Sequence, residues 1–214
     1  MTTPTASQTS TADLDRPAVA EPAATSTGIA DPGALGLCAF ATTTFVLSLF
    51  NAGFVASSME PVVLPLALFY GGLAQLLAGM WEFRKGNTFG ATAFASYGSF
   101  WLAFAAYVQF VVPDLGGSDA AAVPTGLFLL AWTIVTAILL LASLGTNGAI
   151  VAVLTTLFVT FLLLTIGELA GASGVAVAGG YVGILTALVA WYAAAAVVTN
   201  ATWGRVVLPV APLA

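Results

Sequence analysis

The sequence predicts an all-α membrane protein built as a bundle of six transmembrane helices, and composition, apolar run length and charge placement all point to it. Of its 214 residues, 60% are hydrophobic and only 6% are charged. Soluble globular domains carry roughly 25% charged residues. A chain with so few charges cannot cover its surface in water, so we expect lipid to be its solvent.

Six apolar stretches are long enough to cross a bilayer core of ~30 Å, which takes about 20 helical residues. We place them at Leu35–Val55, Val62–Phe83, Ala91–Val112, Val123–Leu144, Ala149–Ala170 and Val175–Val198. Short clusters of turn residues separate them, such as Gly-Thr-Asn-Gly at 145–148 and Gly-Ala-Ser-Gly at 171–174. Loops this short predict antiparallel neighbours in a compact bundle.

The charges predict the orientation. With six spans, every basic residue falls on the same side of the membrane: Arg16, Arg84, Lys85 and Arg205. The opposite side carries the carboxylates Glu60, Asp114 and Asp119. The positive-inside rule makes the basic side cytoplasmic. We therefore expect an integral protein of the cell (inner) membrane, surrounded by lipid, with both termini in the cytoplasm.

Three segments are expected along the chain. Residues 1–30 are rich in Thr, Ser, Ala and Pro and lack aromatic residues, so they cannot bury enough apolar surface to offset their ordering entropy. We predict a disordered cytoplasmic tail there. The six-helix transmembrane domain covers residues 31–205, and residues 206–214 form a short cytoplasmic C-terminal tail.

The composition excludes several classes of function. There is no histidine, and Cys38 is the single cysteine, so the usual metal ligands, general bases and Ser-His-Asp sets are missing. No Gly-rich phosphate loop with its lysine is present. The two Asn-Pro-Ala half-helices expected of water and glycerol channels are also absent. We expect no enzyme activity, no catalytic residue, no cofactor, no metal and no nucleic-acid partner.

A few polar residues lie within the spans. Glu82, beside Arg84 and Lys85, is either part of a local ion pair or an interfacial residue. Glu168 is a functional candidate because intramembrane carboxylates are costly, although an interfacial position fits equally well. Gln75 and Asn51 are costly to bury and need partners. A pore lined by such amides and by hydroxyls can hold a small carboxylate without a fixed positive charge.

One long run resembles a known family. Residues 69–90 read FYGGLAQLLAGMWEFRKGNTFG and residues 91–101 read ATAFASYGSFW. Both resemble the signature of the acetate uptake transporters, which include the bacterial succinate–acetate permeases and the fungal ammonia/acetate exporters. Asn-Ala-Gly at 51–53, Ile-Gly at 166–167 and Trp-Gly-Arg at 203–205 fit the same family in order and spacing.

The resemblance implies a channel or transporter for acetate and related small monocarboxylates, with succinate as a further substrate and one pore in each protomer of a hexameric ring. It also implies an apolar gate of Phe40, Tyr97 and Leu157. At 1.5 Å per residue these three lie ~8, ~9 and ~12 Å from the inner ends of their helices, so they can form one layer. Further substrate-binding or pore residues by motif position or polarity are Gln75, Asn51, Thr43, Leu35, Gly36 and Leu37. Asp31 and Asn87 are expected at the pore entrance.

The start of the first helix departs from the family pattern. The family usually has Asn-Pro-Ala-Pro-Leu-Gly-Leu, whereas this chain has Asp-Pro-Gly-Ala-Leu-Gly-Leu at residues 31–37. Proline suits the first helical position, so Asp31 is expected to be the N-cap residue. The change bears on the substrate range and on the cytoplasmic entrance.

A second class of function stays open. The same bundle can serve as a non-transporting membrane scaffold or sensor, with residues 1–30 as the segment that binds a partner. Uptake of labelled acetate into liposomes containing the pure protein separates the two hypotheses.

Overall fold

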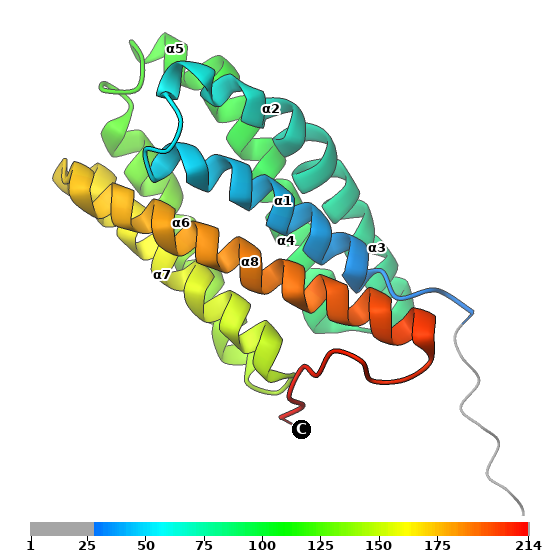
Figure 1. Cartoon of the computed structure of the whole chain (residues 1–214). Helices are drawn as coiled ribbons and strands as arrows, with labels where there is room; N and C mark the ends of the chain where they lie inside the picture. Colours follow the sequence, from blue (N-terminus) through cyan, green and yellow to red (C-terminus); the bar gives the residue numbers. More distant parts are fainter. Residues whose placement is uncertain (1–27, 214) are drawn as a thin grey trace, which may run out of the picture.

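The computed structural model describes residues 28–213, which form an elongated bundle of helices (Figure 1). Within that part of the chain, six helices are long and apolar enough to cross a membrane. Residues 1–27 and 214 lie outside the described residues. Most of the predicted disordered tail falls there, and so does Arg16.

The six predicted spans are confirmed. Four of them are single α-helices, and α1 is the first, at Gly33–Asn51. The second span joins η2 (Ser57–Val62), α2 (Val63–Pro65), η3 (Leu66–Ala74) and α3 (Gln75–Lys85). The third joins α4 (Thr88–Ala106), η4 (Tyr107–Val111) and α5 (Val112–Asp114). The remaining spans are α6 (Ala122–Ser143), α7 (Gly148–Ala170) and α8 (Ser173–Trp203). Stretches η3 and η4 are π-helical, and the spans run a few residues beyond their apolar cores.

The spans form a closed ring in chain order. Helix α1 packs against η3 and α3, α3 against α4, α4 against α6, α6 against α7, α7 against α8, and α8 back against α1. Successive spans are antiparallel because the connections are short, so α1, α4 and α7 all run in the same direction. The ring therefore brings the N-terminal halves of these three helices to the same end of the bundle.

Glycines allow several of these helices to approach closely. A Cβ atom on Gly180 of α8 would lie 2.3 Å from the backbone nitrogen of Ala52. A Cβ on Gly98 of α4 would lie 2.5 Å from the backbone nitrogen of Leu76. The sequence also has two pairs of glycines spaced four residues apart, at 167 and 171 and at 179 and 183. Gly167 packs against Ala176 of α8, whereas Gly171 ends α7 in the left-handed region, with φ of 62°.

The C-terminal segment after α8 is attached to the bundle. The N–H groups of Gly148 and Ala149 donate to the carbonyls of Ala211 and Val210, at 2.8 and 3.2 Å. These bonds satisfy N–H groups that a helix leaves free at its N-terminus. Residues 206–213 thus cover the start of α7.

The packing at Gly180 predicts a position-specific loss of stability. In Gly180→Ala the new methyl group meets backbone atoms of Ala52, which cannot move aside as a side chain can. Overpacking of this kind costs about 1–3 kcal/mol. Gly174→Ala, in the same helix, is the matched control because nothing lies within 4 Å of its Cβ position. Thermal unfolding in detergent, followed by size-exclusion chromatography, should show a lower midpoint for Gly180→Ala alone. Equal midpoints would contradict the packing described here.

Candidate functional site

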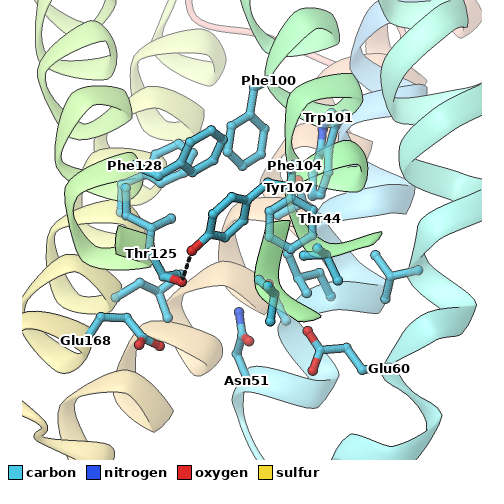
Figure 2. A pocket seen from close by; sticks show the side chains of 18 of the residues that line it. Thr44, Asn51, Glu60, Phe100, Trp101, Phe104, Tyr107, Thr125, Phe128 and Glu168 are labelled. Carbon is cyan, nitrogen blue, oxygen red and sulfur yellow. Dashed lines mark hydrogen bonds between the residues drawn. The ribbon is translucent and has the colours of Figure 1, made fainter. Parts of the chain in front are cut away.

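A cavity of about 380 Å³ lies inside the ring, toward the end of the bundle that carries Glu60 and Glu168 (Figure 2). We call this end of the bundle outer and the opposite end inner, as names for the two ends only. Five of the six spans contribute to the wall of this outer cavity, and α8 does not. The outer ends of the helices place Asn51, Glu60 and Glu168 at its mouth, and Figure 2 shows these three side chains at the same end. The rest of the wall is largely aromatic and aliphatic, with the rings of Phe100, Trp101, Phe104, Tyr107 and Phe128.

The polar groups of this cavity differ in whether the protein satisfies them. The hydroxyl groups of Tyr107 and Thr125 are 2.8 Å apart and share a hydrogen bond. Thr160 donates to the carbonyl of Thr156 at 2.8 Å. In contrast, the hydroxyl of Thr44 and the indole nitrogen of Trp101 are buried and have no hydrogen-bond partner among the described residues.

A smaller inner cavity of about 40 Å³ lies toward the opposite end. It is lined by residues of α1, α3, α4 and α7, among them Leu37, Gln75, Phe94, Val153 and Leu154. Gln75 is the amide in this wall, only 1% exposed, and its Oε1 atom has no partner among the described residues. The sequence predicted that a buried amide here would face the pore, and Gln75 does line this cavity.

Phe40 and Leu157 line both cavities, so they lie between them. Tyr97 lines the inner cavity, and its ring centroid is 5.7 Å from that of Phe40. All three side chains are at most 4% exposed. The Tyr97 hydroxyl donates to Thr136 Oγ1 at 3.0 Å, so the polar end of the ring is bonded to α6. What remains between the cavities is an apolar barrier, which disfavours a charged group.

The other pore residues expected from the sequence fall on two sides of α1. Leu37 lines the inner cavity and Asn51 the outer one. The structure places Leu35, Gly36 and Thr43 outside both cavities. The positions of α1 that line a cavity recur about every three or four residues, at 37, 40, 44, 47 with 48, and 51. Positions 35, 36 and 43 therefore fall on other faces of the helix.

These excluded positions have packing contacts instead. The Thr43 hydroxyl donates to the Ala39 carbonyl at 3.0 Å, and its side chain lies where a Cβ on Gly71 would be. Gly36 gives room to the ring of Phe94. Leu35 is 44% exposed.

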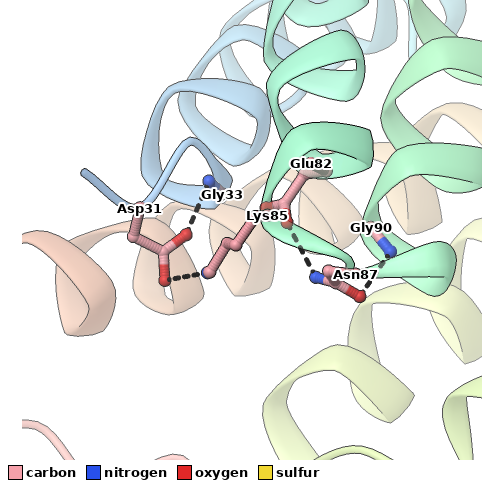
Figure 3. A network of polar contacts seen from close by, with 6 residues as sticks. All are labelled: Asp31, Gly33, Glu82, Lys85, Asn87 and Gly90. Atoms are coloured by element: carbon pink, nitrogen blue, oxygen red, sulfur yellow. Dashed lines mark hydrogen bonds and ion pairs between the residues drawn. The ribbon is translucent and has the colours of Figure 1, made fainter. Parts of the chain in front are cut away.

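The expected entrance residues belong to a polar network at the inner end of the bundle (Figure 3). Asp31 forms an ion pair with Lys85 at 2.9 Å and accepts a hydrogen bond from the N–H of Gly33, also at 2.9 Å. The N-cap residue of α1 is Pro32, so the expectation that Asp31 occupies this position is wrong by one residue. Its carboxylate still bonds to the first turn, as a capping group does.

Glu82 and Asn87 form the second half of this network. Asn87 is the N-cap of α4: its oxygen accepts from the Gly90 N–H at 3.0 Å, and its nitrogen donates to Glu82 at 2.9 Å. Glu82 is 1% exposed, so its carboxylate is enclosed by protein. The expected ion pair of Glu82 with its basic neighbours does not form among the described residues, and Lys85 pairs with Asp31 instead. Asp31 and Asn87 line neither cavity.

Sequence reasoning missed most of the outer cavity. Helical spacing could have predicted two of its lining residues. Trp101 follows Tyr97 by four positions and Thr44 follows Phe40 by four, so each shares the helix face of a predicted gate residue. No helical spacing predicts Glu60, or Ser118 and Ala121 in the connection between the third and fourth spans, as lining residues. They reach the cavity through the fold of the connections between spans.

The comparisons with known proteins agree on one family. Residues 16–214 match the model of the GPR1/FUN34/yaaH family. The chain is 40% identical to the Succinate-acetate/proton symporter SatP of Escherichia coli K12, over 86% of this chain and 96% of that protein. It is 43% identical to Acetate permease A of Emericella nidulans, over 85% of this chain and 66% of the permease.

A solved structure has the same fold. The structure of the bacterial acetate channel SatP matches with a TM-score of 0.77 and 40% identity, covering 85% of this chain and 99% of that one. Its name and those of the relatives describe transport proteins. With six apolar helices in a closed ring and a family match over nearly its whole length, this integral membrane protein belongs to the GPR1/FUN34/yaaH family.

Proposed function

We propose that this protein conducts acetate and related small carboxylates, succinate among them, across a membrane. One observation carries the proposal: an outer and an inner cavity lie on either side of a thin apolar barrier inside one closed ring of helices. The names of the relatives, a succinate-acetate/proton symporter and an acetate permease, support this substrate class.

Uptake of labelled acetate into liposomes that contain the purified protein tests the function. We expect saturable uptake that empty liposomes do not show. An imposed pH gradient then separates the two modes that the relatives' names describe: coupled symport should accumulate acetate above its equilibrium level, and a channel should not. Absence of uptake with correctly folded protein would favour the scaffold or sensor alternative.

The role of the barrier follows from its residues. Phe40, Tyr97 and Leu157 present hydrocarbon to any solute that passes, so crossing requires loss of hydration. We propose that they form the gate and that Leu37 and Gln75 on the inner side, with Asn51 on the outer side, line the pathway. An apolar gate limits the size of the solute as well as its charge.

Leu157→Ala should widen the gate. The side chain is 3% exposed and borders both cavities, so its truncation joins them. We expect the ratio of succinate to acetate flux to rise about three- to tenfold, which corresponds to roughly 1 kcal/mol in the relative barriers. Leu139→Ala is the matched control, since Leu139 is similarly buried, at 4%, and lines neither cavity. If the two variants change the flux ratio equally, Leu157 acts only through packing.

We propose that both termini face the cytoplasm and that the membrane is the cell membrane. Arg84, Lys85 and Arg205 lie at the inner end of the bundle, and Glu60, Asp114 and Asp119 lie at the other. Positive charge retained on the cytoplasmic side gives this orientation. A reporter that works only in the cytoplasm should therefore be active when it is fused after Ala214, and a reporter that works only outside the cell membrane should be inactive there. A reporter active on the outer face would reverse the orientation.

We further propose assembly into a hexameric ring, as the family resemblance implies. The protomer has exposed apolar side chains over most of its outer surface, including Phe69, Met80, Ile138, Leu141 and Tyr181. Lipid or neighbouring protomers can cover such a surface. Native mass spectrometry from detergent should give six copies of the chain, and a predominant monomer would contradict this proposal.

A further inference from the structure

The mouth of the outer cavity carries two carboxylates that no basic residue of the described chain neutralises. Glu60 from η2 and Glu168 from α7 both line the cavity, and both side chains are half buried. Figure 2 shows them at the same end of the cavity, with the amide of Asn51 between them in this view. Neither carboxylate forms an ion pair with a described residue. An anion that enters or leaves this cavity therefore passes close to two negative groups.

The carboxylates at the inner end of the bundle are partnered instead. Asp31 pairs with Lys85 at 2.9 Å, and Glu82 accepts a hydrogen bond from Asn87 at 2.9 Å. Every basic residue of the described part of the chain lies at that inner end. Among the described residues, the negative charge of the outer mouth thus has no cation on its own side of the bundle.

The walls of the cavity strengthen the effect of these two charges. They are largely aromatic and aliphatic, and material of low dielectric constant directs an electric field along a cleft. Glutamate in contact with water ionises at about pH 4.3, so the mouth is negative near neutral pH. The field raises the energy of an anion in proportion to the anion's charge. A dianion is therefore disfavoured by the square of the factor that disfavours a monoanion.

Binding of a metal ion is a different role that two carboxylates could have. Calcium takes about six to eight oxygen ligands, and magnesium about six. The described residues hold no group of three or more acidic residues or cysteines that could bind a metal. The other polar side chains at the mouth, which include Asn51, Ser57 and Ser118, are neutral. The pair is better explained by its effect on the anions that pass.

We propose that Glu60 and Glu168 make the outer mouth a charge filter that favours monocarboxylates over dicarboxylates near neutral pH. This inference deepens the proposed function and rests on it for the solutes that it names. Selectivity is then divided between two places. The mouth discriminates by charge, and the gate of Phe40, Tyr97 and Leu157 discriminates by size.

Initial uptake of labelled acetate and succinate into liposomes of neutral lipid tests the filter. Near neutral pH, acetate carries one negative charge and succinate carries two. Glu168→Gln removes one charge from the mouth. At low ionic strength it should raise the acetate rate about two- to threefold and the succinate rate about four- to ninefold. Glu60→Gln should act in the same direction. Added potassium chloride should reduce both changes, because salt screens the field.

The orientation of the protein in the liposomes does not hide this effect. The field opposes an anion at the same place on its path, whichever way the anion travels. Protein molecules inserted in either direction therefore contribute to the change in the ratio of succinate to acetate uptake.

Two variants serve as matched controls. Glu168→Asp keeps the charge and should keep the ratio of succinate to acetate uptake. Asp114→Asn removes a charge from the same end of the bundle, but Asp114 is exposed to solvent and does not line the cavity. It should change either rate by less than about 1.5-fold. An unchanged ratio in Glu168→Gln, or an equal change in Asp114→Asn, overturns the filter.

A thiol reaction that needs no transport separates failure of the filter from failure of the proposed function. Ser57 is exposed and lines the cavity, and Cys38 is the single cysteine of the chain. Ser57→Cys combined with Cys38→Ala therefore gives one thiol near the mouth. In protein held in uncharged detergent, a cationic methanethiosulfonate reagent should react with this thiol faster than an anionic one, relative to their rates with a free thiol.

Glu168→Gln should lower this preference for the cationic reagent about four- to ninefold, because the two reagents differ by two charges. Asp114→Asn should leave the preference nearly unchanged. An unchanged preference in Glu168→Gln overturns the filter, whether or not the protein transports acetate. A lowered preference in a protein that transports neither solute supports the charge filter and overturns the proposed function.

Discussion

The apolar barrier between the two cavities depends on the near-contact of the backbones of α3 and α4. A Cβ on Gly79 would lie 2.5 Å from the backbone nitrogen of Ala95, and one on Gly98 would lie equally close to that of Leu76. With no side chains between them at these glycines, the two helices pack closely. This contact sets the distance between Gln75 on α3 and Tyr97 on α4, which both line the inner cavity. The glycines of the signature run thus position its polar and aromatic residues.

The network at the inner end fixes the same helices along their axes. Glu82 at the end of α3 bonds to Asn87, which caps α4, and Lys85 bonds to Asp31 before α1. Carboxylates at helix N-termini are favourable because the free N–H groups there carry partial positive charge. The starting points of α1 and α4 are held together by these contacts. Phe40 lies seven residues after the start of α1 and Tyr97 nine after the start of α4, and their rings consequently meet.

The two cavities differ in size on either side of the barrier. The outer cavity, of about 380 Å³, is lined by several polar groups, and the inner cavity, of about 40 Å³, is nearly filled by side chains. The barrier between them is only a few side chains thick. A solute crossing it loses hydration over a short distance, which limits the cost of passage while still disfavouring ions that bind water strongly.

The sequence by itself determined the number of helices, their ends to within a few residues and the family. The resemblance also named Phe40 and Leu157, which border both cavities, and Tyr97, which borders the inner one. Run length, turn clusters and the motif around Tyr97 are local signals, and a bilayer leaves few alternatives to helices for apolar runs of that length. Only the tertiary structure decided which side of each helix faces the cavities. Thr43 and Thr44 are adjacent and chemically identical. Thr43 nevertheless packs against Gly71 of η3, whereas Thr44 lines the outer cavity. The apolar faces of these helices contact lipid as readily as protein, so hydrophobicity does not distinguish the two directions. The burial of Glu82 and the pairing of Asp31 with Lys85 were likewise decided by packing, because they depend on where three separate helix ends meet.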